Sequence, residues 1–369
     1  MDFFLNIPNN KLDDTETEQI LGKSDSEEFH KTLPNYFKTQ LFELKNLSGK
    51  LGIDNIFLKD ESKRFNLNAF KGLGASYAIN KLLIDHPETS VFCTATDGNH
   101  GRAVAWSALI NDKKSVVYVP KDTTKERIEA IAQFGAKVIQ LNKNYEETCD
   151  YAASQSTLNN WILVQDTSWD GYEKIPALIM SGYLTHFKEM EDSINSDIMP
   201  LVDIIFLQCG VGSWPASCIW YYLNRYKENK PKIVLVEPNE ASGILDSFKY
   251  NRRVSPNGSF ETIMAGLNCG IPSKSAWEII KKGCDAVMII NDEDAKTSMR
   301  ALYNPIKDDA KIISGESGAA GLAGLIKCLK DPALSELKNH IGLSSKSRVL
   351  VFNTEGDTDK NSFKSIIGL

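Results

Sequence analysis

The segment NAFKGLGASYAI, residues 68–79, places a lysine, Lys71, directly before a run of small and apolar residues. The apolar spacing predicts a helix from about residue 69 to residue 83, with Lys71 at its start. The helix dipole opposes a cation there and burial penalises the charged form, so both effects are expected to lower the pKa of Lys71. A neutral lysine amine can form an imine with a carbonyl. A solvated surface lysine is the ordinary alternative.

A glycine-rich turn follows a second predicted strand. The segment QCGVGSWPAS indicates a strand that ends before a helix, and the turn contains Gly210, Val211, Gly212 and Ser213. Glycines let backbone N–H groups converge on an anion, and a helix N-terminus adds partial positive charge, so the turn is a candidate phosphate site. It matches neither the P-loop nor the dinucleotide-binding fingerprint. A simple tight turn would explain the same residues.

Polar residues also follow two other predicted strands. TATDGNHGRAVAW presents Asp97, Asn99 and His100, and VLVFNTEGDTD presents Thr354. Parallel sheets bind ligands at the carboxyl ends of their strands, so these side chains are candidates for ligand contacts. Both segments could instead only cap the turns and helices that follow them.

These residues need elements that bring them together, and the chain alternates short β-rich runs with helical stretches. The predicted strands are 90–96, 115–120, 137–141, 161–166, 202–209, 232–238 and 348–357, and the predicted helices between them are 101–110, 124–134, 145–156, 214–227 and 317–330. This alternation is typical of parallel strands joined by crossover helices. We therefore expect an α/β fold with two such units in one chain.

The composition and charge of the chain exclude some classes of binding partner. The chain has 369 residues, a length that indicates either two lobes or one large domain with an insertion. Its 42% hydrophobic and 24% charged residues are ordinary for a globular protein, and its net charge of −6 indicates no basic face for nucleic acid. No apolar run is long enough for a membrane span, so we expect no membrane partner and a cytoplasmic location. The seven cysteines are scattered without a C-x-x-C pair, so neither disulfides nor a metal site is predicted.

Eight segments occur in the order found in one family. They are FLKDES, NAFKGLGASYA, TATDGNHGRAVAWSA, QDTSWDGYEKIP, GVGSW, ETIMAGLNCG, SGESGAAGLAGL and NTEGDTD, and they extend from about residue 57 to residue 359. The chain resembles pyridoxal-phosphate enzymes of the tryptophan-synthase-β type and, within that group, is similar to diaminopropionate ammonia-lyases. The resemblance implies a tryptophan-synthase-β-like α/β fold, with two lobes that each contain a mostly parallel sheet flanked by helices.

The resemblance also implies a domain division and an assembly. Residues 1–87 and 188–369 would form a large cofactor-binding domain, and residues 88–187 would form a small mobile domain. The cofactor would lie between the two domains. A homodimer is expected by resemblance to the family.

The resemblance assigns cofactor contacts residue by residue. Lys71 would carry pyridoxal 5′-phosphate as an imine, Asn99 would contact the oxygen of the ring hydroxyl, and Thr354 would face the pyridine nitrogen. The phosphate would be held by Gly210, Val211, Gly212 and Ser213. Glu316, in SGESG, would lie beside the ring, although a capping role before the following helix explains it nearly as well.

The implied reaction is α,β-elimination of 2,3-diaminopropionate, a small amino acid, to pyruvate and ammonia. Lys71 would remove the α-proton of the L-isomer and Asp97 that of the D-isomer, while Asp166, in VQDTSW, would orient the substrate or assist. A substrate with two amines suits two carboxylates in a dry cleft. A capping role for Asp166 stays open.

Other functions also stay open. The same chemistry serves β-replacement and serine or threonine dehydration, and a non-catalytic binding protein could keep the fold. The sequence departs from the family at Asn66, where glycine is expected, and at Trp214 and Pro215 after the glycine turn. These departures concern the substrate more than the cofactor.

Overall fold

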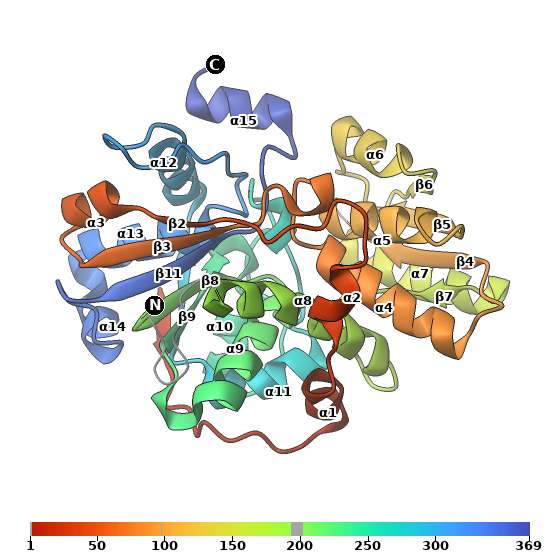
Figure 1. Ribbon diagram of the computed structural model, residues 1–369, viewed down its shortest axis with the longest axis horizontal. Coiled ribbons are helices and arrows are strands. Elements are labelled where there is room, and N and C mark those ends of the chain that lie inside the picture. Colours follow the sequence, from red (N-terminus) through yellow and green to blue (C-terminus); the bar gives the residue numbers. More distant parts are fainter. Residues whose placement is uncertain (1, 97, 193–201) are drawn as a thin grey trace.

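A seven-stranded sheet forms the centre of the larger of two α/β units (Figure 1). The computed structural model describes residues 2–96, 98–192 and 202–369. The strand order is β1 (Phe3–Leu5), β10 (Ala286–Ile290), β9 (Lys232–Pro238), β8 (Ile204–Gln208), β11 (Arg348–Asn353), β3 (Asn55–Asp60) and β2 (Leu41–Glu43). The edge strands β1 and β2 pair antiparallel and the five strands between them are parallel. We call this sheet and its helices the large unit.

Helices cover both faces of this sheet. Successive side chains of a strand point to opposite faces, so Ile205 and Leu207 of β8 join one hydrophobic cluster while Ile204 and Phe206 join the other. The first cluster includes side chains of α9 (Ser213–Tyr226), α10 (Gly243–Tyr250) and α11 (Lys274–Gly283). The second includes α3 (Lys45–Leu51), α12 (Asp292–Tyr303), α13 (Ala320–Lys330) and α14 (Ser335–His340). Burial on both faces explains why these strands are continuously apolar.

The small unit is a four-stranded parallel sheet. Its order is β6 (Lys137–Gln140), β5 (Lys114–Val119), β4 (Val91–Ala95) and β7 (Ile162–Leu163), with crossover helices α5 (Asn99–Leu109), α6 (Lys125–Ala132) and α7 (Tyr145–Asn159). The alternation predicted for residues 90–166 is therefore confirmed. Strand β7 is shorter than the predicted run because the chain leaves the sheet after Val164.

Two long helices, α4 (Gly72–Asp85) and α8 (Lys174–Asp192), pack together where the units meet. The crossing is close because both helices present glycines to it. A Cβ at Gly182 would lie 2.3 Å from the carbonyl oxygen of Leu73, and a Cβ at Gly74 would lie 2.6 Å from the ring of Tyr183. The expected domain boundary at residue 187 falls inside α8.

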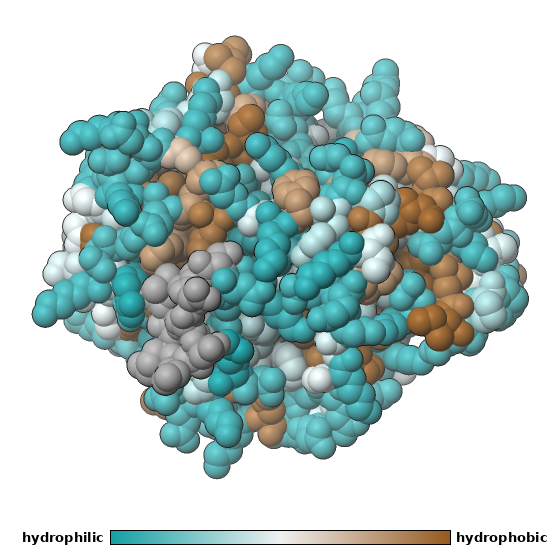
Figure 2. All heavy atoms as spheres, in the orientation of Figure 1, coloured by the Kyte–Doolittle hydropathy of each residue, from teal (hydrophilic) through white to brown (hydrophobic). Residues whose placement is uncertain are grey.

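The remaining elements are short. They are α1 (Glu16–Gly22), α2 (Ser26–His30), α15 (Lys360–Ile367) and the 3₁₀ turns η1 (Arg64–Asn66), η2 (Lys227–Asn229), η3 (Asn239–Ala241), η4 (Ala265–Leu267) and η5 (Pro332–Leu334). Figure 2 shows one face of the molecule, which is covered mostly by hydrophilic side chains. Within the described ranges, no helix is both long and apolar enough to cross a bilayer.

Candidate active site

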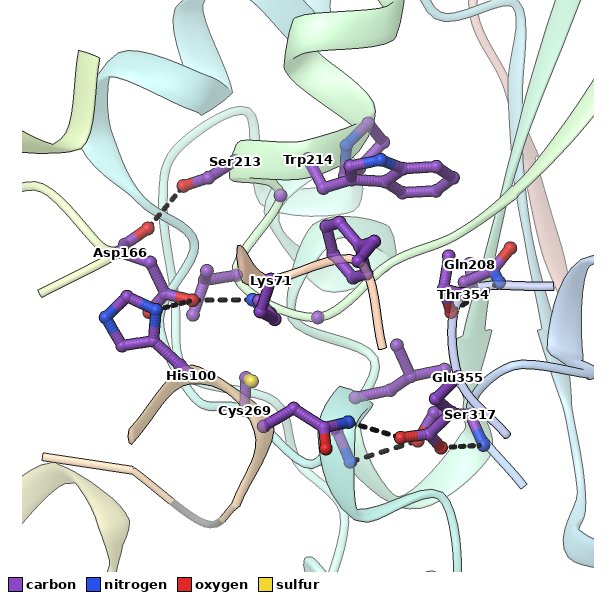
Figure 3. A pocket seen from close by; sticks show the side chains of 18 of the residues that line it. Lys71, His100, Asp166, Gln208, Ser213, Trp214, Cys269, Ser317, Thr354 and Glu355 are labelled. Atoms are coloured by element: carbon purple, nitrogen blue, oxygen red, sulfur yellow. Dashed lines mark hydrogen bonds and ion pairs between the residues drawn. The ribbon is translucent and has the colours of Figure 1, made fainter. Parts of the chain in front are cut away.

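A pocket lies where the carboxyl ends of β4, β8 and β11 come together, between the two units (Figure 3). Most of the predicted site residues line it. They are Lys71, Asn99, Asp166, Gly210, Val211, Gly212, Ser213 and Thr354. Asp97 lies outside the described residues, and Glu316 does not line this pocket.

Backbone pairing positions Lys71. The Phe70 N–H donates to the Thr354 carbonyl at 3.1 Å, and the Gly356 N–H donates to the Asn68 carbonyl at 2.9 Å. These bonds form a short antiparallel bridge that places Lys71 beside the end of β11. A Cβ at Gly356 would lie 2.1 Å from Oδ1 of Asn68, so a larger residue there would displace the Asn68 side chain.

The chain before Lys71 adopts an unusual conformation. Phe65, Asn66 and Asn68 have φ values of 51°, 59° and 57°, in the left-handed region. Asparagine tolerates this region better than most residues, so Asn66 can replace the glycine that the family resemblance led us to expect. Phe65 does not, and its conformation carries strain that the surroundings must hold.

A buried ionic network beside this turn supplies that support. The Arg64 guanidinium donates to Glu61 at 2.8 Å and to Glu189 of α8 at 2.7 Å, and Lys59 donates to Glu189 at 2.9 Å. All four side chains are fully buried, and their two positive and two negative charges balance. Removing one member would leave a buried charge unpaired, which typically costs about 3–5 kcal/mol.

Lys71 forms an ion pair at the centre of the pocket. Its Nζ lies 2.6 Å from Oδ2 of Asp166, and Nδ1 of His100 lies 3.7 Å from the same oxygen. The His100 Nε2 donates to the Val164 carbonyl at 2.8 Å, which fixes the ring. These three groups form one cluster, with Lys71 and His100 on opposite sides of the carboxylate (Figure 3).

The expected direction of the Lys71 pKa shift is wrong. Lys71 does precede α4, and burial alone would lower its pKa, but the Asp166 carboxylate outweighs both effects and raises the pKa of Lys71 above its usual range. Burial would likewise raise the pKa of Asp166, but His100 and Lys71 hold it well below its usual range. The sequence showed the helix start and did not show which carboxylate would face it.

The glycine turn presents backbone donors to the pocket. It lies between β8 and α9, and Gly212 has a φ of 95°, a conformation that favours glycine. Among the described residues, none accepts a hydrogen bond from the N–H groups of Gly210, Val211, Gly212 or Ser213. The Ser213 hydroxyl is already used, because it donates to the backbone carbonyl of Asp166 at 2.6 Å.

Thr354 is held by a buried glutamine. Nε2 of Gln208 donates to Oγ1 of Thr354 at 2.9 Å (Figure 3). The hydroxyl therefore accepts one bond and keeps its own hydrogen for an acceptor in the pocket. Sequence reasoning found Thr354 and missed Gln208, which is 2% exposed at the end of β8.

The structure brings Glu355, and not Glu316, to the pocket. Oε2 of Glu355 accepts from Nδ2 of Asn99 at 2.5 Å, and Oε1 accepts from the Ser317 N–H at 3.1 Å. Glu316 lines a neighbouring cavity, where its carboxylate accepts from the Ser362 hydroxyl. The expectation that Glu316 lies beside the ring is corrected by this placement. The only sequence signal for Glu355 was its position next to Thr354.

Trp214 reaches from the pocket to the buried ionic network. Its Nε1 donates to Nε2 of His186 at 2.9 Å, and Nδ1 of His186 lies 3.7 Å from Glu61. The Trp214 ring also contacts Phe70, with ring centroids 5.5 Å apart. This departure from the family pattern therefore links the start of α9 to the turn that precedes Lys71.

Comparison with known proteins adds to this geometry. The family model described as pyridoxal-phosphate dependent enzyme matches residues 32–354. Diaminopropionate ammonia-lyase of Salmonella typhimurium is 39% identical over 92% of this chain and 90% of its own, and that of Escherichia coli K12 is 36% identical over 98% and 96%. A crystal structure of the Escherichia coli enzyme with an aminoacrylate–PLP azomethine reaction intermediate superposes with a TM-score of 0.89 at 34% identity, covering 100% of this chain and 98% of that one.

Proposed function

Because the chain belongs to the pyridoxal-phosphate-dependent enzyme family, among the relatives of diaminopropionate ammonia-lyase, we propose that it eliminates ammonia from 2,3-diaminopropionate to give pyruvate. Its cofactor is pyridoxal 5′-phosphate and its fold is the tryptophan-synthase-β-like α/β fold that the sequence predicted. The near-full-length similarity to two curated diaminopropionate ammonia-lyases is the observation that carries the choice of substrate.

The pocket residues fit this cofactor. Lys71 offers an amine for its aldehyde, the N–H groups of residues 210–213 suit its phosphate, and the Thr354 hydroxyl hydrogen suits its ring nitrogen. When bound, pyridoxal phosphate supplies an electron-accepting ring that stabilises negative charge at the α-carbon of the substrate. We propose these residues and Asn99 as the ones that hold it.

Thr354 tunes the reaction in this proposal. A hydroxyl that donates its hydrogen leaves the ring nitrogen unprotonated, whereas a carboxylate in its place would keep that nitrogen positively charged. An unprotonated ring withdraws electrons less strongly. Elimination, which needs only brief stabilisation of the carbanion, is then favoured over chemistry that accumulates it.

Lys71 and Asp166 move the proton. The Asp166 carboxylate, 2.6 Å from Nζ, stabilises the ammonium that Lys71 becomes when it takes the α-proton of the L-isomer. A raised pKa therefore makes Lys71 a stronger base at the moment when it acts. His100 Nδ1, 3.7 Å away on the other side of the carboxylate, helps to keep Asp166 ionised.

Asp97 and Asp166 together distinguish the substrate. A diamino acid carries one more positive charge than serine, and a buried carboxylate left without a cationic partner costs a few kcal/mol. Asp97 is proposed as the base for the D-isomer.

We further propose that the protein forms a homodimer and lies in the cytoplasm. Residues 1–87 and 188–369 would form one domain and residues 88–187 a smaller one, which moves on ligand binding.

The test is pyruvate release by the cofactor-loaded protein. L- and D-diaminopropionate are compared with L-serine, D-serine and L-threonine, whose product is assayed as its own keto acid. Preferential turnover of the diamino acid is expected. Turnover of serine or threonine alone would make the protein a dehydratase, and inactivity on the whole panel despite bound cofactor would favour β-replacement. A protein that binds no cofactor would be a non-catalytic relative.

A further inference from the structure

Glu355 occupies a position that joins the two units inside the pocket. It follows β11 of the large unit, and the residue is 5% exposed. One oxygen accepts from the Ser317 N–H, in the large unit, and the other from Nδ2 of Asn99, the first residue of α5 in the small unit. Figure 3 shows Glu355 and Ser317 on the side of the pocket away from Asp166.

The carboxylate decides which way the Asn99 amide points. An asparagine amide has a donor end and an acceptor end of almost equal size, so packing alone does not select between its two flipped orientations. A carboxylate accepts hydrogen bonds and, when ionised, donates none. Only the Nδ2 end of Asn99 can therefore face Oε2 of Glu355, and one hydrogen of Nδ2 remains available.

The bonding pattern suits the ionised form of Glu355. Both of its oxygens accept from N–H groups, so neither has an acceptor for a proton of its own. Burial raises the pKa of Glu355, and the positive field of Arg127 opposes this. A charge-assisted hydrogen bond is roughly twice as strong as a neutral one. The bond from Asn99 to Glu355 therefore fixes the orientation of the Asn99 amide.

From this geometry we propose that Glu355 is a positioning residue that holds the Asn99 amide as a donor toward the ionised ring oxygen of pyridoxal phosphate. Without Glu355 the amide can flip, and its oxygen would then repel that ring oxygen. The inference rests on the proposed role of Asn99 in holding the cofactor. It does not depend on which amino acid is the substrate.

A double-mutant cycle on cofactor binding tests this inference. Asn99→Ala, Glu355→Ala and the double variant are prepared without cofactor and titrated with pyridoxal phosphate. Because a hydrogen bond to a charged oxygen is lost, each single variant is expected to bind roughly ten- to a hundredfold more weakly. In the Asn99→Ala background, Glu355→Ala should change the affinity by less than about twofold.

The absorbance of the bound cofactor gives a second readout. A ring oxygen that loses its donor takes up a proton more easily, so both single variants should lose visible absorbance and gain near-ultraviolet absorbance. Glu293→Ala is the control, since it removes an exposed carboxylate that pairs with Lys296 of the same helix and does not line the pocket. It should leave the ratio of the two bands unchanged.

Additive losses of cofactor affinity in the cycle would overturn the inference. A Glu355→Ala variant that loses only thermal stability, and keeps its affinity and its ratio of the two bands, would also overturn it. If Glu355→Ala does not fold, Glu355→Gln takes its place in the cycle. The glutamine can still accept from Asn99, but its own amide must then face the Ser317 N–H. A smaller, non-additive loss is expected for it. These readouts need no substrate, so they stay valid if the protein proves inactive on diaminopropionate.

Discussion

A lysine paired with a buried carboxylate is a strong base that is slow to lose its own proton. Lys71 is in this situation, because the Asp166 carboxylate outweighs the burial that would otherwise lower its pKa. Imine formation requires the neutral amine, so cofactor capture and proton abstraction make opposite demands on the same nitrogen. Asp166 favours the second of these.

Replacing Asp166 by asparagine should therefore change the pH at which the cofactor is captured. With the carboxylate gone, burial is left as the main effect and lowers the pKa of Lys71, so covalent capture should begin at a lower pH than in the parent protein. The rate at which visible absorbance appears, measured across a pH series, reports the shift. Asp170→Asn is the control, because Asp170 is exposed and pairs with Lys274. Coincident pH profiles for the parent and Asp166→Asn would contradict this account.

Asp97 is the proposed base for the D-isomer and Lys71 the proposed base for the L-isomer, so a variant at Asp97 can test the two roles apart. Asp97→Asn removes the proposed base for the D-isomer and leaves Lys71 for the L-isomer. Turnover of D-diaminopropionate should fall by roughly 10²- to 10⁴-fold, while turnover of the L-isomer falls by less than about tenfold. Pyruvate release from each isomer measures this. Equal losses on both isomers would mean that Asp97 acts in binding and not as a base.

At the scale of elements, the glycine turn before α9 has to meet two structural requirements. Its backbone donors must face the pocket, and Gly212 must hold a φ of 95° with little space around it. A Cβ at Gly212 would lie 2.8 Å from Cδ1 of Ile280 on α11. The position is thus constrained by conformation and by packing together.

Gly212→Ala should weaken phosphate binding as well as stability. We expect a loss of about 1–3 kcal/mol in the free energy of unfolding. Affinity should fall for pyridoxal phosphate and much less for pyridoxal, which lacks the phosphate. Gly52→Ala is the matched control, because Gly52 has a φ of 75° with open space around it and does not line the pocket. An equal loss of affinity for both ligands would argue against a phosphate role.

A histidine fixes the first turns of α4. His30, at the end of α2, donates from Nε2 to the Leu73 carbonyl at 2.9 Å, and its Nδ1 accepts from the Thr185 hydroxyl of α8 at 2.6 Å. This pattern uses the neutral ring, and burial lowers the pKa of His30 to about 3. Three helices around the Lys71 segment therefore meet at one uncharged imidazole.

His30 should make stability depend on pH. The unfolded histidine binds a proton below about pH 6.5 and the folded one only near pH 3, so stability falls as the pH drops through this range, by up to about 1.4 kcal/mol per unit. Urea unfolding of the parent and of His30→Gln, compared at several pH values, measures the effect. Burial also lowers the pKa values of His100 and His186, so the variant should lose only the part of the slope that His30 contributes. His86→Gln, at an exposed histidine, should keep the parent slope. Parallel slopes for the parent and His30→Gln would refute this assignment.

For the whole molecule, local patterns predicted the alternating elements and most of the pocket. Hydrophobic runs and turn residues located the strands, and the carboxyl ends of parallel strands must meet, so Lys71, Asn99 and Thr354 could be expected near one another. The sequence could not predict that Glu355, and not Glu316, lines the pocket. This depends on which side of the 314–319 segment faces the pocket. The Lys71–Asp166 pair depends on long-range packing for the same reason.

Cofactor binding should reduce backbone opening where the two units meet. Binding of pyridoxal phosphate is expected to slow amide hydrogen exchange at the start of α5 and at the bridge between residues 68–70 and 354–356, and to leave the outer helix α14 unchanged. Mass spectrometry of peptides with and without cofactor measures this. Uniform slowing across the chain would instead indicate global stabilisation alone.

The central place of β11 has a consequence for how the protein is made. The strand lies between β8 and β3, and Asn353 at its end bonds Asp60, a partner 293 residues earlier. While the ribosome is still adding residues 348–353, the edges of β3 and β8 have no neighbour there, and the bridge beside Lys71 cannot close. Closure of this bridge therefore has to wait until the chain has been synthesised past residue 356, and a nascent chain that stalls earlier exposes two apolar strand edges to its neighbours.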